Sequence, residues 1–198
     1  ALVARTPSGE AKAWPVVHTI QVDGVCDEVI APAQDLDQAT ATAAAEAALR
    51  IANEFGVTGV MAAELFETPG VGAGFVINEL AMRPHNTGHW TMNGSVTSQF
   101  EQHLRAVLDL PLGQTRELGV TVMKNYLGGA NEDLYSAFAA ALAAAPEVKV
   151  HAYGKSVRPG RKIGHVNVVA DAGQSVDELR EQANKVAALI RDGVDAKN

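Results

Sequence analysis

The sequence predicts a mixed α+β fold in which most strands run antiparallel. Short apolar segments are joined by tight-turn sequences such as Asp23-Gly24, whose residues tolerate the positive φ of a hairpin turn. Longer segments, such as residues 98–110, repeat apolar side chains every three or four positions, which is the period of a helix. Hairpins and helices of this kind within one chain indicate the α+β class.

The first part of the chain is expected to contain several hairpin strands and two helices. The longer helix has Asp35 or Asp37 as its N-cap, because a short carboxylate accepts hydrogen bonds from the first turn, and Gly56 ends it. In order, the expected elements are strands at 1–5, 11–14, 16–22 and 25–31, a helix from the aspartates to about 55, strands at 57–67 and 74–81, an aperiodic loop at 82–97 and a helix at 98–110.

The Pro-Leu-Gly sequence at 111–113 resembles a boundary, so the sequence predicts two domains, at residues 1–112 and 113–198. The expected elements of the second domain are a strand at 119–127, a helix at 132–145, a strand at 147–153, a basic loop, a strand at 163–170 and a helix at 175–192. The chain opens on an apolar segment with no Met and no helix cap. We interpret this start as a strand already under way, in a piece of a longer protein.

Composition excludes several classes of protein. The 198 residues are 47% hydrophobic and 20% charged, which is typical of a globular protein and not of a disordered one. The net charge of −7 argues against non-specific binding to nucleic acid. No segment approaches the roughly 18 apolar residues of a membrane-spanning helix. The single Cys26 excludes an internal disulfide and a thiolate metal cage.

A pair of glutamates is the first candidate for chemistry. If the hairpin of strands 57–67 and 74–81 is symmetric about the Val71–Gly72 bond, Glu64 lies opposite Glu79 with Cβ atoms about 5 Å apart. Like charges so placed are destabilising unless a cation lies between them, and Mg²⁺ is a hard cation that carboxylates bind. The alternative is a register that differs by one residue, with one glutamate in solvent.

The loop after the second glutamate is unusually rich in polar groups. Arg83 has a planar guanidinium that suits bicarbonate, carboxylate or phosphate, and His85 and Asn86 add hydrogen-bond donors. A lone histidine beside an apolar strand is usually structural. An arginine, several polar donors and two carboxylates within about 25 residues are more typical of a binding site than of a surface loop.

A second concentration of positive charge lies near residue 160. The four cations of this cluster surround a Pro-Gly turn, which suits the capture of one phosphate group; they are Lys155, Arg158, Arg161 and Lys162. The alternative is an ordinary solvated basic turn. The two common glycine-rich nucleotide-binding sequences are absent from the chain, so neither supports a nucleotide site.

Several segments together resemble one known family. They are Glu64 and residues 78–91, 97–101, 105–113 and 155–165, with additional matches at 14–17 and 30–33. These segments are similar to 5-(carboxyamino)imidazole ribonucleotide synthases, the ATPase subunits of phosphoribosylaminoimidazole carboxylase, in the ATP-grasp superfamily. The Arg-Pro-His-Asn-Thr-Gly-His-Trp sequence at 83–90 is the most specific part. The resemblance covers nearly the whole chain.

The resemblance implies a fold, an activity and partners. Residues 1–112 would be the second lobe of an ATP-grasp fold, an antiparallel sheet with helices, and 113–198 a small α/β C-terminal domain. The N-terminal substrate domain and the first ATP-grasp lobe would lie outside these 198 residues. The implied activity is that of an ADP-forming ligase, the ATP- and bicarbonate-dependent carboxylation of 5-aminoimidazole ribonucleotide through carboxyphosphate in purine biosynthesis. The resemblance also implies a cytoplasmic homodimer, and a fragment that is inactive alone.

The same resemblance implies a metal and nucleotide site. Glu64 and Glu79 would bind Mg²⁺, or Mn²⁺ in its place, which bridges the phosphates of the co-substrate ATP. Arg5 would approach the nucleotide phosphates. Many ATP-grasp enzymes have an asparagine ligand two residues after the second glutamate, but this chain has Ala81 there. The second metal would then depend on Glu79, phosphate and water, and Asn78 is expected among the cofactor-binding residues and not among the metal ligands.

The resemblance also implies residues for the other substrates. Arg83, His85 and Asn86 would hold bicarbonate and then carboxyphosphate. The phosphate of aminoimidazole ribonucleotide would contact the cationic cluster, namely Lys155, Arg158, Arg161 and Lys162. Two alternatives stay open. One is another ATP-grasp ligase, such as a formate-dependent glycinamide ribonucleotide transformylase or a biotin carboxylase. The other is a non-catalytic module that binds magnesium or phosphate.

Overall fold

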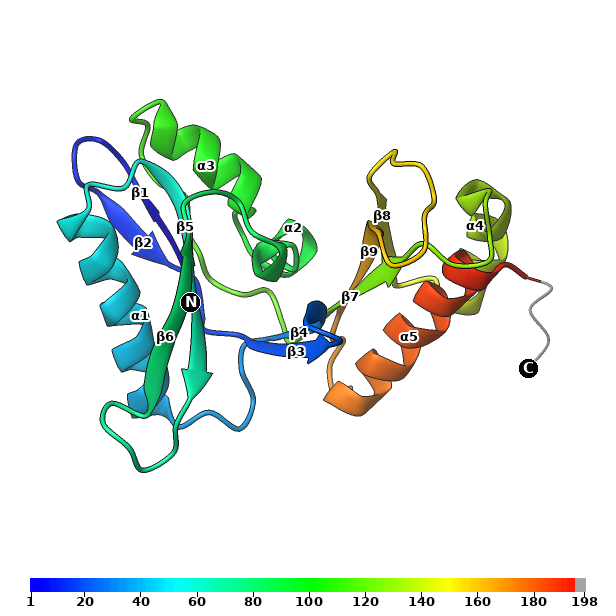
Figure 1. Ribbon diagram of the computed structural model, residues 1–198, viewed down its shortest axis with the longest axis horizontal. Coiled ribbons are helices and arrows are strands. Elements are labelled where there is room, and N and C mark those ends of the chain that lie inside the picture. The colour runs from blue at the N-terminus through cyan, green and yellow to red at the C-terminus, as the bar shows by residue number, and fades with distance from the viewer. Residues whose placement is uncertain (195–198) are drawn as a thin grey trace. The chain divides into compact units, whose positions relative to one another are not determined.

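The computed structural model describes residues 1–194, and within them the chain divides into two compact units (Figure 1). The first unit comprises Ala1–His18 and Ala31–Leu118. The second comprises Thr19–Ile30 and the chain from Gly119 onward. Each unit contains a sheet with antiparallel strand pairs and helices packed against it, so the predicted α+β class is confirmed.

The first unit is built on a four-stranded sheet with the order β2-β1-β5-β6. Its elements are β1 (Leu2–Arg5), β2 (Ala11–Ala13), α1 (Gln38–Glu54), β5 (Gly59–Glu67), β6 (Phe75–Ala81), the 3-10 turn η1 (Asn86–Gly88), α2 (Thr91–Gly94) and α3 (Gln99–Val107). Helix α1 packs Ala48 and Ala52 against Val3 and Met61 of the sheet. Since side chains alternate along a strand, Glu64 lies on the face of β5 opposite to Met61 and α1.

The ends of α1 follow the local chemistry of the sequence. Asp37, not Asp35, is the N-cap, and its carboxylate accepts a hydrogen bond of 3.0 Å from the Thr40 backbone N–H. Gly56 follows the helix with a φ of 59°, a left-handed conformation that glycine adopts without strain. The next strand therefore starts two residues later than expected, at Gly59.

The second unit is built on a five-stranded sheet with the order β3-β4-β7-β9-β8. Its elements are β3 (His18–Val22), β4 (Val25–Ala31), β7 (Thr121–Leu127), η2 (Leu134–Ala137), α4 (Phe138–Ala144), β8 (Lys149–Ala152), β9 (Lys162–Val169) and α5 (Val176–Asp192). Helix α5 begins with a capping box in which Ser175 and Glu178 exchange hydrogen bonds. Its buried face, which includes Leu179 and Ile190, packs on Val122 and Val166 of the sheet.

The two units differ from the predicted domains in two respects. Residues 19–30 lie in the second unit although they fall within 1–112, and the chain changes unit after Leu118 and not after Leu112. The reason is that β4 hydrogen-bonds to β7 and adds Ile30 to the core of the second unit. The expected helix at 132–145 is also shorter, because η2 occupies its first turn.

Among the helices that the structure describes, none combines the length and the apolar character needed to cross a membrane.

Candidate active site

The two glutamates predicted to face each other do so. In the ladder of β5 and β6, Glu64 pairs with Glu79, as the symmetric hairpin requires. The register then shifts by one residue, because Leu65 pairs with Ile77. Asn78 is the extra residue of this β-bulge, a feature that re-aims neighbouring side chains. The predicted pairing of the glutamates is therefore confirmed, whereas the predicted symmetry ends at them.

His85 completes a cluster with these glutamates. Its Nε2 lies 3.5 Å from Oε1 of Glu64, and one ligand atom from each of Glu64, Glu79 and His85 lies within 4.8 Å of the others. Glu79 is exposed, Glu64 is half-buried and His85 is buried. Two carboxylates suit Mg²⁺ or Mn²⁺, and an imidazole nitrogen is a better ligand for Mn²⁺ than for Mg²⁺. The donor set thus fits one divalent cation.

A buried glutamine fixes the backbone of His85. Oε1 of Gln99 accepts a hydrogen bond of 2.8 Å from the His85 N–H, and Nε2 of Gln99 donates one of 2.8 Å to the His85 carbonyl oxygen. Nε2 of Gln99 also lies 3.0 Å from Nδ1 of His89. The Gln99 side chain is fully buried, so these bonds form away from water, where an unpaired partner is costly. Gln99 therefore holds His85 in place beside Glu64.

Polar groups within the loop around His85 hydrogen-bond to one another. Nδ1 of His85 lies 3.0 Å from the Thr87 hydroxyl, and the Thr91 hydroxyl donates a hydrogen bond of 2.6 Å to the Gly88 carbonyl oxygen. A Cβ at Gly88 would collide with Gln99 and lie 2.8 Å from Cδ2 of Leu2. Packing thus requires glycine at position 88, and the Thr87 hydroxyl is used in a hydrogen bond.

The other candidates of this loop lie in different surroundings. Nδ2 of Asn86 is buried, and it has no hydrogen-bond partner within residues 1–194, so it is a donor in need of an acceptor. Arg83 is exposed, and its Nη1 donates to the carbonyl oxygen of Pro84 at 3.2 Å. Asn78 is exposed at the bulge. Only Asn86 therefore combines burial with an unused hydrogen-bonding group.

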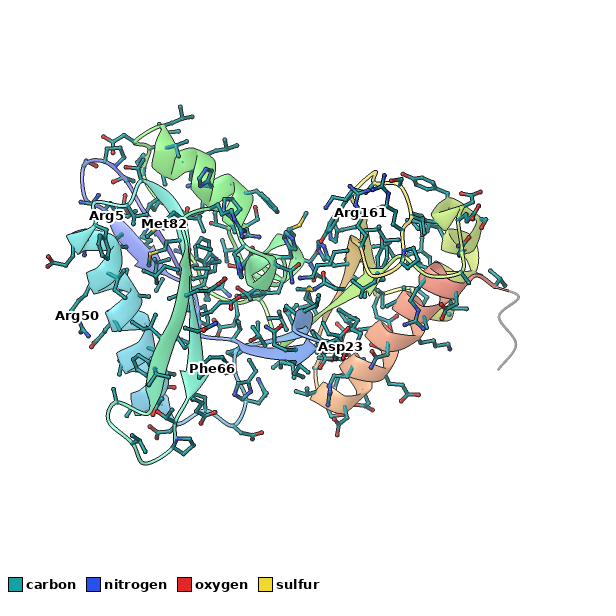
Figure 2. All side chains as sticks on the ribbon, viewed as in Figure 1. Arg5, Asp23, Arg50, Phe66, Met82 and Arg161 are labelled. Carbon is teal, nitrogen blue, oxygen red and sulfur yellow. The ribbon has the colours of Figure 1, made fainter. Side chains whose placement is uncertain are left out.

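Arg5 has structural partners. Its Nε donates to Oδ1 of Asn53 at 2.9 Å, and its Nη1 donates to the carbonyl oxygens of Thr6 and Val57 at 3.0 and 3.3 Å. These bonds join β1 to the C-terminal end of α1, where Figure 2 shows Arg5. The guanidinium thus stabilises the junction of the helix and the sheet.

The four cations of the predicted phosphate-binding cluster belong to one loop and the strand after it. Lys155, Arg158 and Arg161 lie between β8 and β9, where Figure 2 labels Arg161, and Lys162 is the first residue of β9. Nη1 of Arg161 donates to Oγ of Ser156 at 2.9 Å and so closes the loop on itself. Nζ of Lys155 lies over the ring of Tyr153, 5.1 Å from its centroid. We call residues 155–162 the basic loop.

Sequence reasoning missed the residues that support both groups of candidates. Gln99 and Gln102 are polar, three residues apart and buried, which marks them as residues that hold other groups. That spacing is present in the sequence, but the apolar repeat of Phe100, Leu104, Val107 and Leu108 predicts burial of the opposite face of the helix. Tyr153 and His165, which support the basic loop, carry no spacing signal, because strand pairing brings them together.

Comparison with protein-family models identifies the class. Residues 1–100 match the ATP-grasp domain, and residues 121–181 match the phosphoribosylaminoimidazole carboxylase C-terminal domain. The first match covers most of the unit that contains the paired glutamates, and the second covers most of the unit that contains the basic loop. The chain belongs to the ATP-grasp family.

Its relatives within that family include N5-carboxyaminoimidazole ribonucleotide synthases. The enzyme of Mycobacterium tuberculosis is 52% identical over 201 residues, which cover 98% of this chain and 45% of the relative. The enzyme of Escherichia coli is 43% identical over 166 residues, covering 83% of this chain and 43% of the relative. The chain thus spans about half the length of the curated relatives that it matches.

Solved structures agree with this assignment. The N5-carboxyaminoimidazole ribonucleotide synthetase of Thermus thermophilus superposes with a TM-score of 0.81 at 35% identity, over 99% of this chain and 51% of the other. The synthase of Aspergillus clavatus, in complex with ADP and 5-aminoimidazole ribonucleotide, gives a TM-score of 0.83 at 33% identity, over 96% of this chain and 50% of the other.

Proposed function

We propose that this chain is part of an N5-carboxyaminoimidazole ribonucleotide synthase, in which it supplies the metal and bicarbonate side of the active site and a phosphate-binding loop. The observation that carries the proposal is the cluster of Glu64, Glu79 and His85, held by Gln99 in a family of ATP-dependent ligases. The relatives bear this name, and one was solved with ADP and 5-aminoimidazole ribonucleotide. The first ATP-grasp lobe and the N-terminal substrate domain, outside these residues, would complete the ATP site, and the assembled enzyme would be a homodimer.

The metal fits the residues present. The carboxylates of Glu64 and Glu79 would hold Mg²⁺ or Mn²⁺, and His85 would orient Glu64 or serve as a third ligand. When bound, the cation supplies neutralisation of the negative charge on the ATP phosphates. Glu64 is held in place on a paired strand and against His85, so the site needs little reorganisation to accept the ion.

The protein does not supply a nucleophile to this reaction. Its task is to align the anionic reactants. An oxygen of bicarbonate attacks the γ-phosphorus of ATP, and ADP leaves with the electron pair of the broken P–O bond. The exocyclic amine of the ribonucleotide then attacks the carbonyl carbon of carboxyphosphate, phosphate leaves, and the amine loses a proton. Asn86 Nδ2 is an unused buried donor for an oxygen of bicarbonate, and Arg83 would turn from Pro84 toward the same anion.

A chimera tests this function. We would replace the matching segment of the Mycobacterium tuberculosis enzyme by this chain and measure ADP formation with each substrate omitted in turn. We expect ADP formation that requires bicarbonate and rises with aminoimidazole ribonucleotide. Activity with formate and glycinamide ribonucleotide in its place would indicate another ATP-grasp ligase. A chimera that unfolds cooperatively but forms no ADP would contradict the proposal and leave a non-catalytic binding module.

A further inference from the structure

The basic loop is anchored to the end of β7. The N–H of Gly128 donates to the carbonyl oxygen of Arg161 at 2.8 Å, and Gly128 forms an isolated bridge with Pro159. A Cβ at Gly128 would collide with the carbonyl oxygen of Arg158 and lie 2.7 and 2.8 Å from its carbonyl carbon and nitrogen. The backbones touch so closely that only glycine fits, so the middle of the loop has a fixed position.

The beginning of the loop is fixed by a different contact. Tyr153, directly after β8, brings its hydroxyl within 2.7 Å of Nδ1 of His165 on β9. The ring of His165 stacks on that of His151, with 4.5 Å between centroids, and His165 is almost completely buried. Burial raises the pKa of Tyr153, so the phenol keeps its proton at neutral pH, and its hydroxyl shares a hydrogen bond with the imidazole. The face of the same ring lies under Nζ of Lys155.

The cations of the basic loop therefore have different surroundings. Arg161 is bonded to Ser156 and shapes the loop. Lys155 rests on an aromatic ring whose orientation depends on a half-buried hydrogen bond. An ammonium group over an aromatic ring is attracted by its electrons but keeps N–H donors for an anion. Lys155 is thus held in place while its N–H donors remain available to an anion.

We propose that Tyr153 and His165 are positioning residues, which hold Lys155 where it binds the phosphate group of the substrate. The inference rests on the proposed function, which assigns a phosphate-binding role to the basic loop. The hydrogen bond to His165 stops rotation of the Tyr153 side chain, and the ring then limits the positions open to Lys155. Since less side-chain entropy is lost on binding, the affinity for the phosphate group is higher than that of a free lysine.

The experiment uses this chain within the chimera with the Mycobacterium tuberculosis enzyme described above, which is called the unsubstituted chain when it has no further substitution, and two ligands, 5-aminoimidazole ribonucleotide and ribose 5-phosphate. Tyr153→Phe removes the hydroxyl and keeps the ring, Tyr153→Leu removes both, and His165→Phe removes the imidazole that bonds to the hydroxyl and keeps a ring against His151. Tyr126→Phe is the matched control, because it removes a buried hydroxyl that donates to the His151 carbonyl oxygen in the same sheet. The dissociation constant and the NMR shift of the Lys155 ε-methylene protons, which the ring displaces upfield, are measured for each variant.

We expect about tenfold weaker binding of both ligands by Tyr153→Leu, with loss of the upfield shift, and about threefold weaker binding by Tyr153→Phe and by His165→Phe. The double variant Tyr153→Phe/His165→Phe should stay near threefold, since both changes break one hydrogen bond. Tyr126→Phe should bind within twofold of the unsubstituted chain. A misfolded Tyr153→Leu protein leaves the double variant as the deciding measurement.

Two failures can be told apart. If the unsubstituted chain binds the ligands and Tyr153→Leu binds them equally well, the positioning role is wrong while the phosphate role of the loop stands. Losses that multiply to about ninefold in the double variant also overturn the positioning role. If the unsubstituted chain binds neither ligand, the phosphate role of the loop fails, and the inference fails with it.

Discussion

Glu64 and Glu79 illustrate what single residues contribute at this site. They are directly opposed on neighbouring strands, an arrangement that destabilises a sheet when both side chains are charged. His85 offsets this repulsion only when its imidazole is protonated. Gln99 fixes the His85 backbone by two hydrogen bonds, so the imidazole cannot move away from the glutamates without breaking them. The molecule thus maintains a concentration of negative charge that a bound divalent cation would relieve.

The first prediction concerns this charge. Glu64→Gln and Glu79→Gln should each weaken Mn²⁺ or Mg²⁺ binding by the chain more than about tenfold, because one ion needs both carboxylates. The double variant should be at most about threefold weaker than either single variant, since residues that act as a unit are not additive. Isothermal titration measures both quantities. With EDTA present, each single variant should melt about 1–3 °C higher, because repulsion is removed.

Glu101→Gln is the matched control, because Glu101 is exposed and pairs with Arg105 on the same helix. It should leave metal affinity unchanged. Losses that multiply in the double variant, or single variants that bind the ion as the unsubstituted chain does, would show that the glutamates form an ordinary cross-strand pair.

At the scale of elements, α3 reverses the usual rule for an amphipathic helix. Its apolar face is predicted to be buried, yet Phe100, Leu104 and Leu108 are exposed, with Leu104 at 61%. The buried face instead contains Gln99 and Gln102. Each of these glutamines bonds to both backbone groups of one loop residue, namely His85 and Gly113. The buried face of the helix therefore supplies the side chains that hydrogen-bond to and hold two loops.

This reversal gives the second prediction. Gln102→Leu should destabilise the chain by about 1–3 kcal/mol, because it removes the partners of the Gly113 N–H and carbonyl groups. Leu104→Gln, its counterpart on the exposed face, should change stability by less than about 0.5 kcal/mol. Urea unfolding followed by circular dichroism measures both. The opposite order of the two losses would mean that the apolar face of α3 is the buried one in solution.

Local features of the fold and site were predictable, and features set by packing were not. The pairing of Glu64 with Glu79 follows from turn symmetry, and the end of α1 follows from Gly56, because both are determined by a few neighbouring residues. The bulge at Asn78 has no signal of its own. The burial of Gln99 could not be inferred from hydrophobic periodicity, which assumes that apolar side chains face the core. Both depend on contacts between distant segments.

At the scale of the whole molecule, the main surprise is the hairpin of residues 19–30. It lies early in the chain but belongs to the second unit, where its side chains find partners about 100 or more residues away. Asp27 forms an ion pair with Lys124, and the buried Glu28 accepts a hydrogen bond of 2.7 Å from Nε of Arg180. Residues this far apart leave no periodic pattern. A boundary placed at the Pro-Leu-Gly sequence therefore separates β3 and β4 from the rest of the sheet to which they belong.

The last prediction tests this organisation. A fragment of residues 119–198 should lack a cooperative unfolding transition, or melt at least about 10 °C lower than a fragment in which residues 18–31 are joined to its N-terminus by a flexible Gly-Ser linker. Without the hairpin, β7 becomes an open edge and the core loses Ile30, and both effects reduce stability. The same fusion with Ile30→Asp is the control, and it should behave like the shorter fragment, because the charge would have to be buried. Thermal unfolding followed by circular dichroism distinguishes the three proteins. Equal melting temperatures for the fragments with and without the hairpin would show that residues 119–198 fold independently, and the hairpin would then be an accessory strand pair and not part of the core of the unit.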